Sequence, residues 1–471
     1  MRIALVSFAI VGFLGLSSIA SAEVIREIVV EENTKTDDDT VALIARLDVG
    51  DDWDNSMIED IKKRLESSGL FKTITVFSEP HKSGTGVKVT ILVKDKHSWV
   101  IAPAFYTQPT NIGGGVGFGE NNLFGRNQKL LLYGQIATGD SFFIGAWVIP
   151  KLRGTRWYAQ LDAFLKSSRV IEYAPPTSYL NTTPNDGANQ AVRESRLNYL
   201  NGGVRLGIEL LRGLKVDARI RAARVSYGKV KLAGCAQDPC DPATIEDVTG
   251  DPAATTLPDP GAEGYDVSTE FTASLDRRAS FNGIQTGYRY AASFETASPG
   301  LGSDFRYFLT GLGMFRGEQV LKRHNLVFKA NVGYGFHLPF QQEYVTGGTS
   351  MRGWLNGQFR GDFRAIANLE YSVPIVTIAG LSMRGMVFWD SAFTTFLRTD
   401  NPQRNYLPNS QRDQANNDSK FNEYLAPFKN SVGIGTRFSM RQIVLPLLGL
   451  DFAYGLEARD FQIYLAIGLT D

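Results

Sequence analysis

Charged and apolar positions alternate along most of this chain. In the clearest stretch, Lys215, Asp217, Arg219 and Arg221 are separated by the small or apolar residues Val216, Ala218 and Ile220. Residues 159–165 and 364–373 repeat the pattern less strictly. Because successive side chains of a strand point to opposite faces, this period of two predicts β-strands with one polar and one apolar face. Such strands suit a soluble sandwich as well as a membrane barrel, where the apolar face meets lipid and the polar face lines the lumen.

The lengths of the connections favour the barrel. Sixteen candidate strands begin near residues 98, 111, 127, 142, 156, 198, 215, 263, 284, 304, 322, 362, 380, 428, 447 and 460. The long connections, 171–195, 232–262, 336–361 and 393–427, all follow odd-numbered strands, and the connections after even-numbered strands are short. Up-and-down outer-membrane barrels have this asymmetry between their two ends. We therefore expect residues 98–471 to form a mainly β, 16-stranded transmembrane antiparallel β-barrel.

Residues 23–97 carry a different pattern. Strand-like runs at 24–30, 71–77 and 86–93 accompany two expected helices, at 36–47 and 55–68. The second helix gathers its apolar side chains on one face, and Gly69 follows as a C-cap. The order β-α-α-β-β in about 70 residues predicts one small α+β domain with a single modest core.

The first 22 residues indicate export. Arg2, an apolar core over 3–16 and the small residues at 20–22 are typical of a secretory signal peptide, the alternative being a short membrane anchor. Its removal leaves 48 basic and 49 acidic residues, a balance that does not suggest a nucleic-acid partner. Exported proteins meet oxidising conditions, so Cys235 and Cys240 are expected to form a local disulfide.

One arginine stands in a glycine-rich part of the connection 336–361. The residues around Arg352 include Gly347, Gly348, Gly353 and Trp354. A guanidinium cannot shed its charge, so an enclosed arginine needs a carboxylate. Asp390, at the end of an apolar run, is a candidate. We interpret Arg352 as the tip of a long loop folded back inside the barrel; the alternative is an exposed arginine in a glycine-rich turn.

Three stretches resemble the Omp85 superfamily, which includes BamA-like, TamA-like and two-partner secretion transporters. Gly117–Arg126 is similar to the family's early turn, Gly347–Trp354 to its sixth-loop motif, and Gly385–Asp390 to the strand whose acid meets the loop arginine. Asn368–Tyr371 also fits, and residues 23–97 resemble one POTRA domain. The chain departs from the family in having room for one POTRA domain, no evident plug helix and no terminal aromatic residue.

The resemblance implies a bacterial outer-membrane barrel with its POTRA domain in the periplasm. It implies that Arg352 pairs with Asp390, with Glu370 as a second lumenal acid. It also implies a seam between the first and last strands that can open sideways. Pro103 and Gly468 are expected to weaken that seam, although both can equally well shape strand ends. The expected partners are outer-membrane lipid, unfolded or extended client polypeptides, and a periplasmic protein bound through the POTRA domain.

Other functions stay open at this point. A passive porin or structural barrel is the main alternative, and the small domain can be a spacer. The four histidines, at 81, 97, 324 and 337, form no metal-spaced pair, and no phosphate loop occurs. The stretch 348–353 has one residue too many for a nucleophile elbow. A lipase whose serine and histidine converge on one face of the barrel is the enzymatic alternative. We expect no enzymatic activity, no metal and no cofactor.

Overall fold

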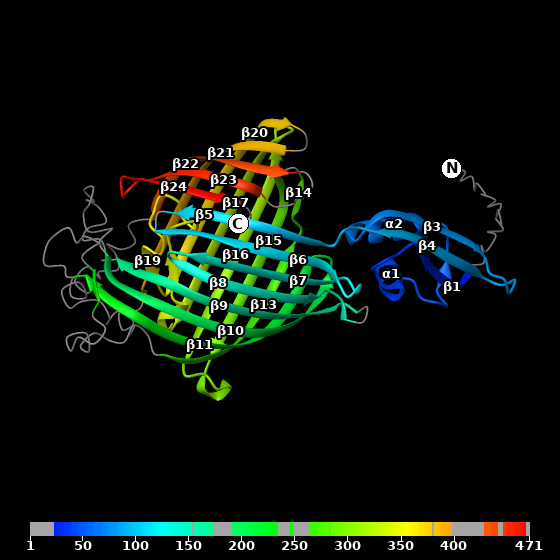
Figure 1. The fold of residues 1–471 in the computed structure, drawn as a ribbon, viewed down its shortest axis with the longest axis horizontal. Helices are drawn as coiled ribbons and strands as arrows, with labels where there is room; N and C mark the ends of the chain where they lie inside the picture. Colours follow the sequence, from blue (N-terminus) through cyan, green and yellow to red (C-terminus); the bar gives the residue numbers. More distant parts are fainter. Residues whose placement is uncertain are drawn as a thin grey trace, which may run out of the picture. The chain divides into compact units, whose positions relative to one another are not determined.

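The computed structural model describes residues 23–108, 110–152, 155–173, 191–233, 245–247, 263–281, 283–378, 381–397, 428–440 and 446–467 (Figure 1). They form two compact units, the first reaching to Ser98 and including Phe124–Asn127, the second containing the rest. The expected signal peptide, the expected disulfide and Gly468 lie outside the described residues.

The first unit contains a small sheet and two helices. The elements are β1 (Glu23–Glu31), α1 (Asp38–Ala45), β2 (Asp52–Trp53), α2 (Met57–Ser67), β3 (Phe71–Pro80) and β4 (Val87–Asp95). The sheet order is β2-β1-β4-β3, in which only β1 and β4 are parallel. Ile61 and Leu65 of α2 pack with Ile25, Val89 and Ile91 of the sheet in one apolar core. The expected small α+β domain is confirmed, with β2 as an additional two-residue strand.

One carboxylate ties the end of β4 to the segment before α1. Asp95 Oδ2 accepts hydrogen bonds from the backbone N–H groups of Thr34 and Lys35, both at 2.7 Å. The hydroxyl of Thr36 donates to Asp95 Oδ1 at 2.5 Å. Partial burial raises the pKa of Asp95, but these hydrogen bonds stabilise the charged form and hold the pKa below its ordinary value.

The second unit is a closed antiparallel barrel of sixteen long strands, counted over the described residues, which confirms the expected fold. The strands are β5 (Trp99–Gln108), β6 (Asn111–Leu123), β7 (Gln128–Ala137), β8 (Asp140–Ile149), β9 (Trp157–Tyr173), β10 (Ala191–Leu211), β11 (Leu214–Ala233), β13 (Gly264–Asp276), β15 (Ile284–Ala297), β16 (Tyr307–Val320), β17 (His324–Phe336), β20 (Phe363–Ile378), β21 (Leu381–Thr395), β22 (Lys429–Met440), β23 (Pro446–Gly455) and β24 (Asp460–Ile467). The short strands β12 (Ile245–Asp247) and β14 (Ala279–Phe281) pair with β11 and β15.

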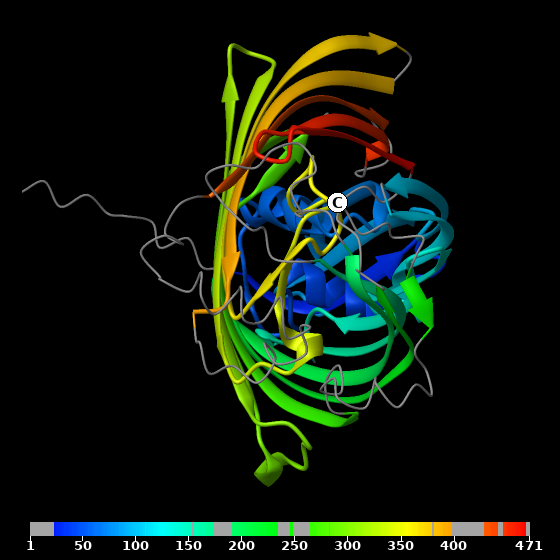
Figure 2. The same ribbon diagram turned by 90° about the vertical axis from the view of Figure 1, so that its left-hand side faces the viewer.

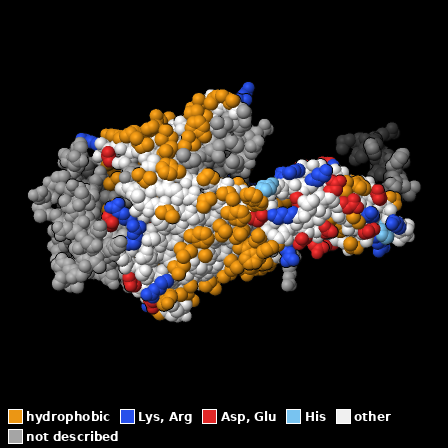
Figure 3. All heavy atoms as spheres, viewed as in Figure 1, with side chains coloured by type: hydrophobic (Ala, Val, Ile, Leu, Met, Phe, Trp, Pro, Cys, Tyr) orange, Lys and Arg blue, Asp and Glu red, His pale blue; other side chains and the backbone are white. Residues whose placement is uncertain are grey.

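The apolar face of the strands is the outer face. On β11, Val216 and Ile220 are exposed, whereas Asp217 and Arg221 on the opposite face are buried. Figure 3 shows hydrophobic side chains gathered over the outside of the strands. This distribution is the reverse of a soluble sandwich and fits a wall that meets lipid outside and polar groups inside. Neither helix in the described part of the chain has the length and apolar character needed to span a membrane.

The first and last strands join through a short pairing. In the described residues, β24 meets β5 through three residue pairs, Leu465–Thr107, Ala466–Tyr106 and Ile467–Phe105. The neighbouring ladders are longer, with eight pairs between β23 and β24 and ten between β5 and β6. Pro103 lies opposite Val116 of β6 and outside the described pairing with β24.

The segment between β17 and β20 folds into the barrel. This inner loop (residues 337–362) contains η5 (Phe340–Gln342), β18 (Tyr344–Thr346) and β19 (Phe359–Gly361), and β18 pairs with β19. In Figure 2 the loop, drawn in yellow, lies within the ring of strands. A further short helix, η4 (Pro299–Leu301), connects β15 to β16. Leu338, Phe340, Met351 and Trp354 of the inner loop are almost fully buried.

Candidate functional site in the barrel lumen

Arg352 at the tip of the inner loop is enclosed and bound to Asp390 of β21. Arg352 is 5% exposed and Asp390 is 0% exposed. Nε donates to Asp390 Oδ2 and Nη2 donates to Asp390 Oδ1, both at 2.8 Å. The backbone N–H of Arg352 also donates to Oδ2, at 3.1 Å. This two-point pairing fixes the direction of the guanidinium as well as its distance from the wall.

Two further acids face the same guanidinium. Glu370 of β20 lies 2.9 Å from Nη2, and Asp451 of β23 lies 3.3 Å from Nη1. The guanidinium carbon is 3.5 Å from the centre of the Phe388 ring. Burial by itself would lower the pKa of Arg352, but the hydrogen bonds and charges of Asp390, Glu370 and Asp451 raise it above its usual value. The arginine therefore stays charged and can hold the loop, but it cannot transfer a proton.

Asp451 also connects the loop to a second arginine. Arg437 of β22 donates to Asp451 through Nη1, at 2.5 Å, and through Nη2, at 2.8 Å. Asn368 of β20 adds a hydrogen bond to Asp390 at 3.0 Å and one to the carbonyl of Ser350 at 3.2 Å. The cluster thus links the loop to four consecutive wall strands, β20 to β23.

The glycines of the loop are required by its backbone. Gly347 has a φ of +122°, and a Cβ there would lie 1.9 Å from the carbonyl oxygen of Leu355. Gly353 has a φ of +87°, and a Cβ there would lie 2.8 Å from the amide nitrogen of Gly455. Such a close approach leaves no room for a side chain. The N–H of Gly348 donates to the carbonyl of Trp354 at 3.0 Å and closes the turn.

Tyr464 of β24, which sequence reasoning did not single out, binds the loop backbone twice. The N–H of Gly353 donates to the Tyr464 hydroxyl at 3.0 Å. That hydroxyl donates in turn to the carbonyl of Trp354 at 3.1 Å. The alternation of β24 places position 464 on the inner face, but no sequence signal indicated its partner. The tip is consequently attached to the last strand, immediately beside the three-pair closure.

A second group of polar contacts holds the base of the inner loop. Gln342 donates to Asp266 of β13 at 2.9 Å. Asp266 is fully buried and lies 3.3 Å from Arg221 of β11, whose Nη2 is also 2.5 Å from Glu295 of β15. The hydroxyl of Tyr307 donates to Asp266 at 2.9 Å. The loop is thus anchored on opposite sides of the wall, at its base by β13 and at its tip by β20 to β24.

The predicted loop residues therefore meet in space, and Pro103, the predicted seam residue that the structure describes, takes no part in their contacts. Arg352, Asp390 and Glu370 form one cluster, with Trp354 donating from Nε1 to the carbonyl of Asn430 at 3.3 Å. Pro103 lies in β5, away from these contacts. The described residues include no group of three or more His, Cys, Asp or Glu side chains arranged to hold a metal ion.

Comparisons with known proteins agree with this geometry. The family model described as the Omp85 superfamily domain matches residues 122–470. Among solved structures, BamA from Haemophilus ducreyi lacking POTRA domains 1–3 aligns with a TM-score of 0.62 at 17% identity, covering 95% of this chain and 84% of that one. CdiB from Acinetobacter baumannii aligns with a TM-score of 0.60 at 12% identity, covering 95% and 74%. CdiB from Escherichia coli gives 0.57 at 11% identity, covering 95% and 77%. No curated protein matches the sequence.

Proposed function

The chain belongs to the Omp85 superfamily of bacterial outer-membrane barrels, and from this premise we propose that it inserts client polypeptides into the membrane or translocates them across it. In this proposal the POTRA-like domain, residues 23–97, lies in the periplasm. The observation that carries the proposal is the closure of the barrel, three residue pairs within the described residues, beside an inner loop that is bound at its base and its tip. The passive porin or structural barrel is the alternative.

The closure supports sideways opening because it contains few contacts to break. Within the described residues, three pairs join β24 to β5, against eight and ten in the adjacent ladders. Backbone groups of an opened edge are ready to pair with an extended client strand. Pro103, without an N–H, adds no ladder donor on β5. We therefore place the entry of a client strand at this seam.

The inner loop supports a closed resting state. Its base is bound to Asp266 and its tip to Asp390, so it crosses the interior between two sides of the wall. An open porin needs a continuous aqueous channel, and a loop anchored at both ends obstructs one. We propose that Arg352 and its acids hold this plug while no client is engaged.

The small domain supports client capture by strand addition. In the sheet order β2-β1-β4-β3, strand β3 is an edge strand of ten residues. An extended polypeptide can add to such an edge through main-chain hydrogen bonds. The alternative role for this domain is that of a spacer.

Locking the seam tests the proposal. Thr107 and Leu465 are directly opposed, so cysteines at these positions can form a disulfide across the closure. Oxidation of Thr107→Cys/Leu465→Cys is expected to deplete particular outer-membrane or secreted proteins from the proteome, and reduction is expected to restore them. Native Cys235 and Cys240 are replaced by serine in all of these variants.

The matched control locks two strands that are already firmly paired. Tyr454 of β23 and Phe461 of β24 are opposed in the same way, and Tyr454→Cys/Phe461→Cys is expected to leave the proteome unchanged. A seam-locked protein that still supplies every client would exclude sideways opening. A gene deletion that alters no surface or secreted protein would favour the porin or structural barrel.

A further inference from the structure

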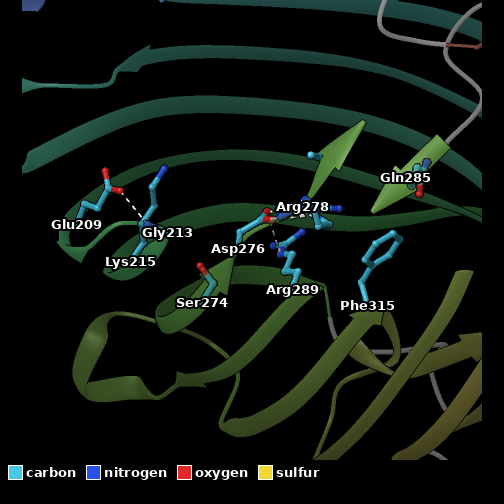
Figure 4. A pocket seen from close by; sticks show the side chains of 10 residues that line it. Glu209, Gly213, Lys215, Ser274, Asp276, Arg278, Gln285, Arg289 and Phe315 are labelled. Carbon is cyan, nitrogen blue, oxygen red and sulfur yellow. Dashed lines mark hydrogen bonds and ion pairs between the residues drawn. The ribbon is translucent and has the colours of Figure 1, made fainter. Parts of the chain in front are cut away.

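The barrel wall is hollowed at the end where the short connections lie. This pocket has a volume of 680 Å³ and opens toward the lumen between β10, β11, β13, β15 and β16 (Figure 4). Its lining includes the charged residues Glu209, Lys215, Asp276, Arg278 and Arg289, with Ser274 and Gln285 as polar neighbours. The strand pairing sets Asp276 beside Arg289, and Arg289 beside Phe315. Lys215 shares the inner face of β11 with Asp217, opposite the exposed Val216.

The charges in the pocket do not balance locally. Three cations, Lys215, Arg278 and Arg289, accompany two acids. Arg278 donates to Asp276 from Nη2 at 2.7 Å and from Nε at 3.0 Å. The other acid, Glu209, accepts a hydrogen bond from the N–H of Gly213 at 3.0 Å. Both acids are therefore already engaged by other groups.

Lys215 and Arg289 keep donors available. Nε of Arg289 is 3.9 Å from Asp276, beyond hydrogen-bond distance. Among the described residues no acid lies within ion-pair distance of Lys215, whose Nζ stands 5.3 Å from the centre of the Tyr158 ring. The Arg289 side chain is 46% exposed, so its guanidinium is accessible from the pocket.

The same strands neutralise their arginines farther along the wall. Arg205 of β10 lies 2.7 Å from Glu270, and Arg221 of β11 lies 2.5 Å from Glu295. Arg219 is paired with Asp162. The pocket departs from this pattern at two cations. Among the described residues Lys215 has no acid within ion-pair distance, and the one acid near Arg289, Asp276 at 3.9 Å, is already bound by Arg278. An anion that enters the lumen from this end meets Lys215 and Arg289 before it reaches the arginines that are paired with acids.

We propose that this pocket binds acidic side chains of an extended polypeptide. The guanidinium fork of Arg289 and the ammonium of Lys215 suit carboxylates, and the polar side chains of Ser274 and Gln285 can bind a passing peptide backbone. The pocket lies on the inner face of the wall, which favours a polypeptide over a lipid headgroup. The inference rests on the proposed function, because only a polypeptide handled by the barrel would reach this site. Binding depends on salt, since the cations are exposed.

The test is a binding measurement on the full-length protein in detergent micelles. Fluorescein-labelled hexaglutamate is expected to bind, and labelled hexaglutamine is not. Lys215→Gln/Arg289→Gln is expected to weaken hexaglutamate binding about tenfold or more, through loss of both charge-assisted contacts. Each single variant should give part of that loss and serves in place of the double variant if the latter does not fold.

Arg316→Gln is the matched control. Arg316 lies next to Phe315 on β16 but on the opposite face, stacked over Tyr288 and paired with Glu318. Its replacement removes one positive charge, as Arg289→Gln does, and is expected to leave hexaglutamate binding unchanged. Equal binding by the parent and the double variant, or equal loss in Arg316→Gln, would overturn the inference. So would binding of inorganic phosphate without binding of hexaglutamate.

This assay separates the inference from the proposed function. It requires neither a membrane nor a client, so it reports on the pocket alone. Hexaglutamate binding by a protein whose gene deletion alters no surface or secreted protein would support the site and argue against transport. An altered proteome after gene deletion, together with no hexaglutamate binding, would support transport and argue against the site.

Discussion

Arg352 holds its position through a surplus of acids rather than through one partner. Asp390 accepts two hydrogen bonds from its guanidinium, and Glu370 and Asp451 each supply a further ion pair. A buried ion pair does not guarantee net stability, because desolvation opposes the attraction. Removing one partner nevertheless leaves the other buried and uncompensated, so the arginine controls the loop more than it stabilises the barrel.

Replacing the arginine should release the tip of the loop. Arg352→Ala leaves Asp390 fully buried without its partner, and we expect a loss of about 3–5 kcal/mol in the free energy of loop docking. Limited proteolysis of residues 337–362 in the assembled barrel measures the release. Asp390→Asn is the graded control, because Glu370 and Asp451 still face the guanidinium and a smaller effect is expected. An Arg352→Ala protein that resists protease and functions like the parent would contradict the role of Arg352 in holding the loop.

Replacing Gly353 should disturb the tip without changing any charge. Its φ is +87°, and a Cβ would lie 2.8 Å from the amide nitrogen of Gly455 and 3.0 Å from the carbonyl carbon of Tyr454. Gly353→Ala is therefore expected to increase cleavage of the loop by protease, because neither backbone can move aside cheaply. Gly357→Ala has a comparable positive φ but no atom within 4 Å, and it should have a smaller effect. Equal cleavage of both variants would remove the steric argument.

Acid should loosen the segment before α1. The pKa of Asp95 is held below its ordinary value, about 4, by hydrogen bonds that favour the carboxylate. A depressed pKa contributes stability that is complete above the unfolded value and is lost as pH falls through the folded one. Amide exchange of Thr34–Thr36, corrected for the intrinsic rate, is therefore expected to accelerate below about pH 4. Asp95→Asn should exchange rapidly at every pH; protection in that variant equal to the parent would remove the role of the charge.

The part of the site that sequence reasoning reached depended on a simple electrostatic demand. A permanent cation in a glycine-rich loop needs an acid, and this pointed to Asp390. Glu370 was expected only from the family resemblance, and both acids contact Arg352. Asp451 was out of reach because it lies 99 residues beyond Arg352 and is one of many acids on inner strand faces. Its position beside Arg352 follows from the closing of the barrel, which no local pattern expresses.

At the scale of elements, the inner loop and strand β24 act on one another through Tyr464. The hydroxyl accepts from Gly353 and donates to the carbonyl of Trp354, while its strand closes the barrel through three pairs. The loop therefore reinforces β24, the strand that closes the barrel against β5. Loop release and seam opening are expected to favour each other.

Tyr464→Phe tests this link by removing one oxygen atom. Loss of both hydrogen bonds should leave β24 more mobile, so the Thr107→Cys/Leu465→Cys pair should oxidise less completely in this background. The fraction of crosslinked protein on a non-reducing gel is the measurement. Tyr454→Phe is the control, because Tyr454 lies on the outer face of β23. Identical crosslinking in all backgrounds would show that the loop does not reinforce the seam.

The long elements were predictable, and the short ones were not. Period-two alternation located the sixteen long strands, since each is long enough to show its two faces. Strands β2, β12, β14, β18 and β19 contain only two or three residues, too few to display a period. They exist because a neighbouring edge offers backbone partners, which is a property of the assembled fold. The expected second helix, 55–68, begins instead at Met57 and ends at Ser67.

For the whole molecule, the inner loop predicts a low conductance. The parent protein in a planar bilayer should give small, unsteady currents, because the loop is fixed at both ends within the lumen. Replacing residues 338–360 by a short glycine-serine linker should raise the conductance severalfold. A steady, wide channel in the parent that the deletion leaves unchanged would favour the passive porin. The loop is then restored in two forms, one with Arg352 and one with Arg352→Ala. If only the form with Arg352 restores the small currents, the contacts of Arg352 with its acids are what keep the channel obstructed.

The short pairing of Leu465–Ile467 with Phe105–Thr107 also has a consequence for biogenesis. Strands β5 and β24 are the first and last of the sixteen long strands, so the barrel stays an open sheet until β24 is in place. Contacts between such distant segments form late, because the entropy of closing so large a circuit must be overcome first. A chain truncated before Tyr464 would lack the pairing between β24 and β5, and it would lack the tyrosine that binds the inner loop. The open sheet of such a truncated chain would expose two unpaired strand edges, and we expect proteases to degrade it.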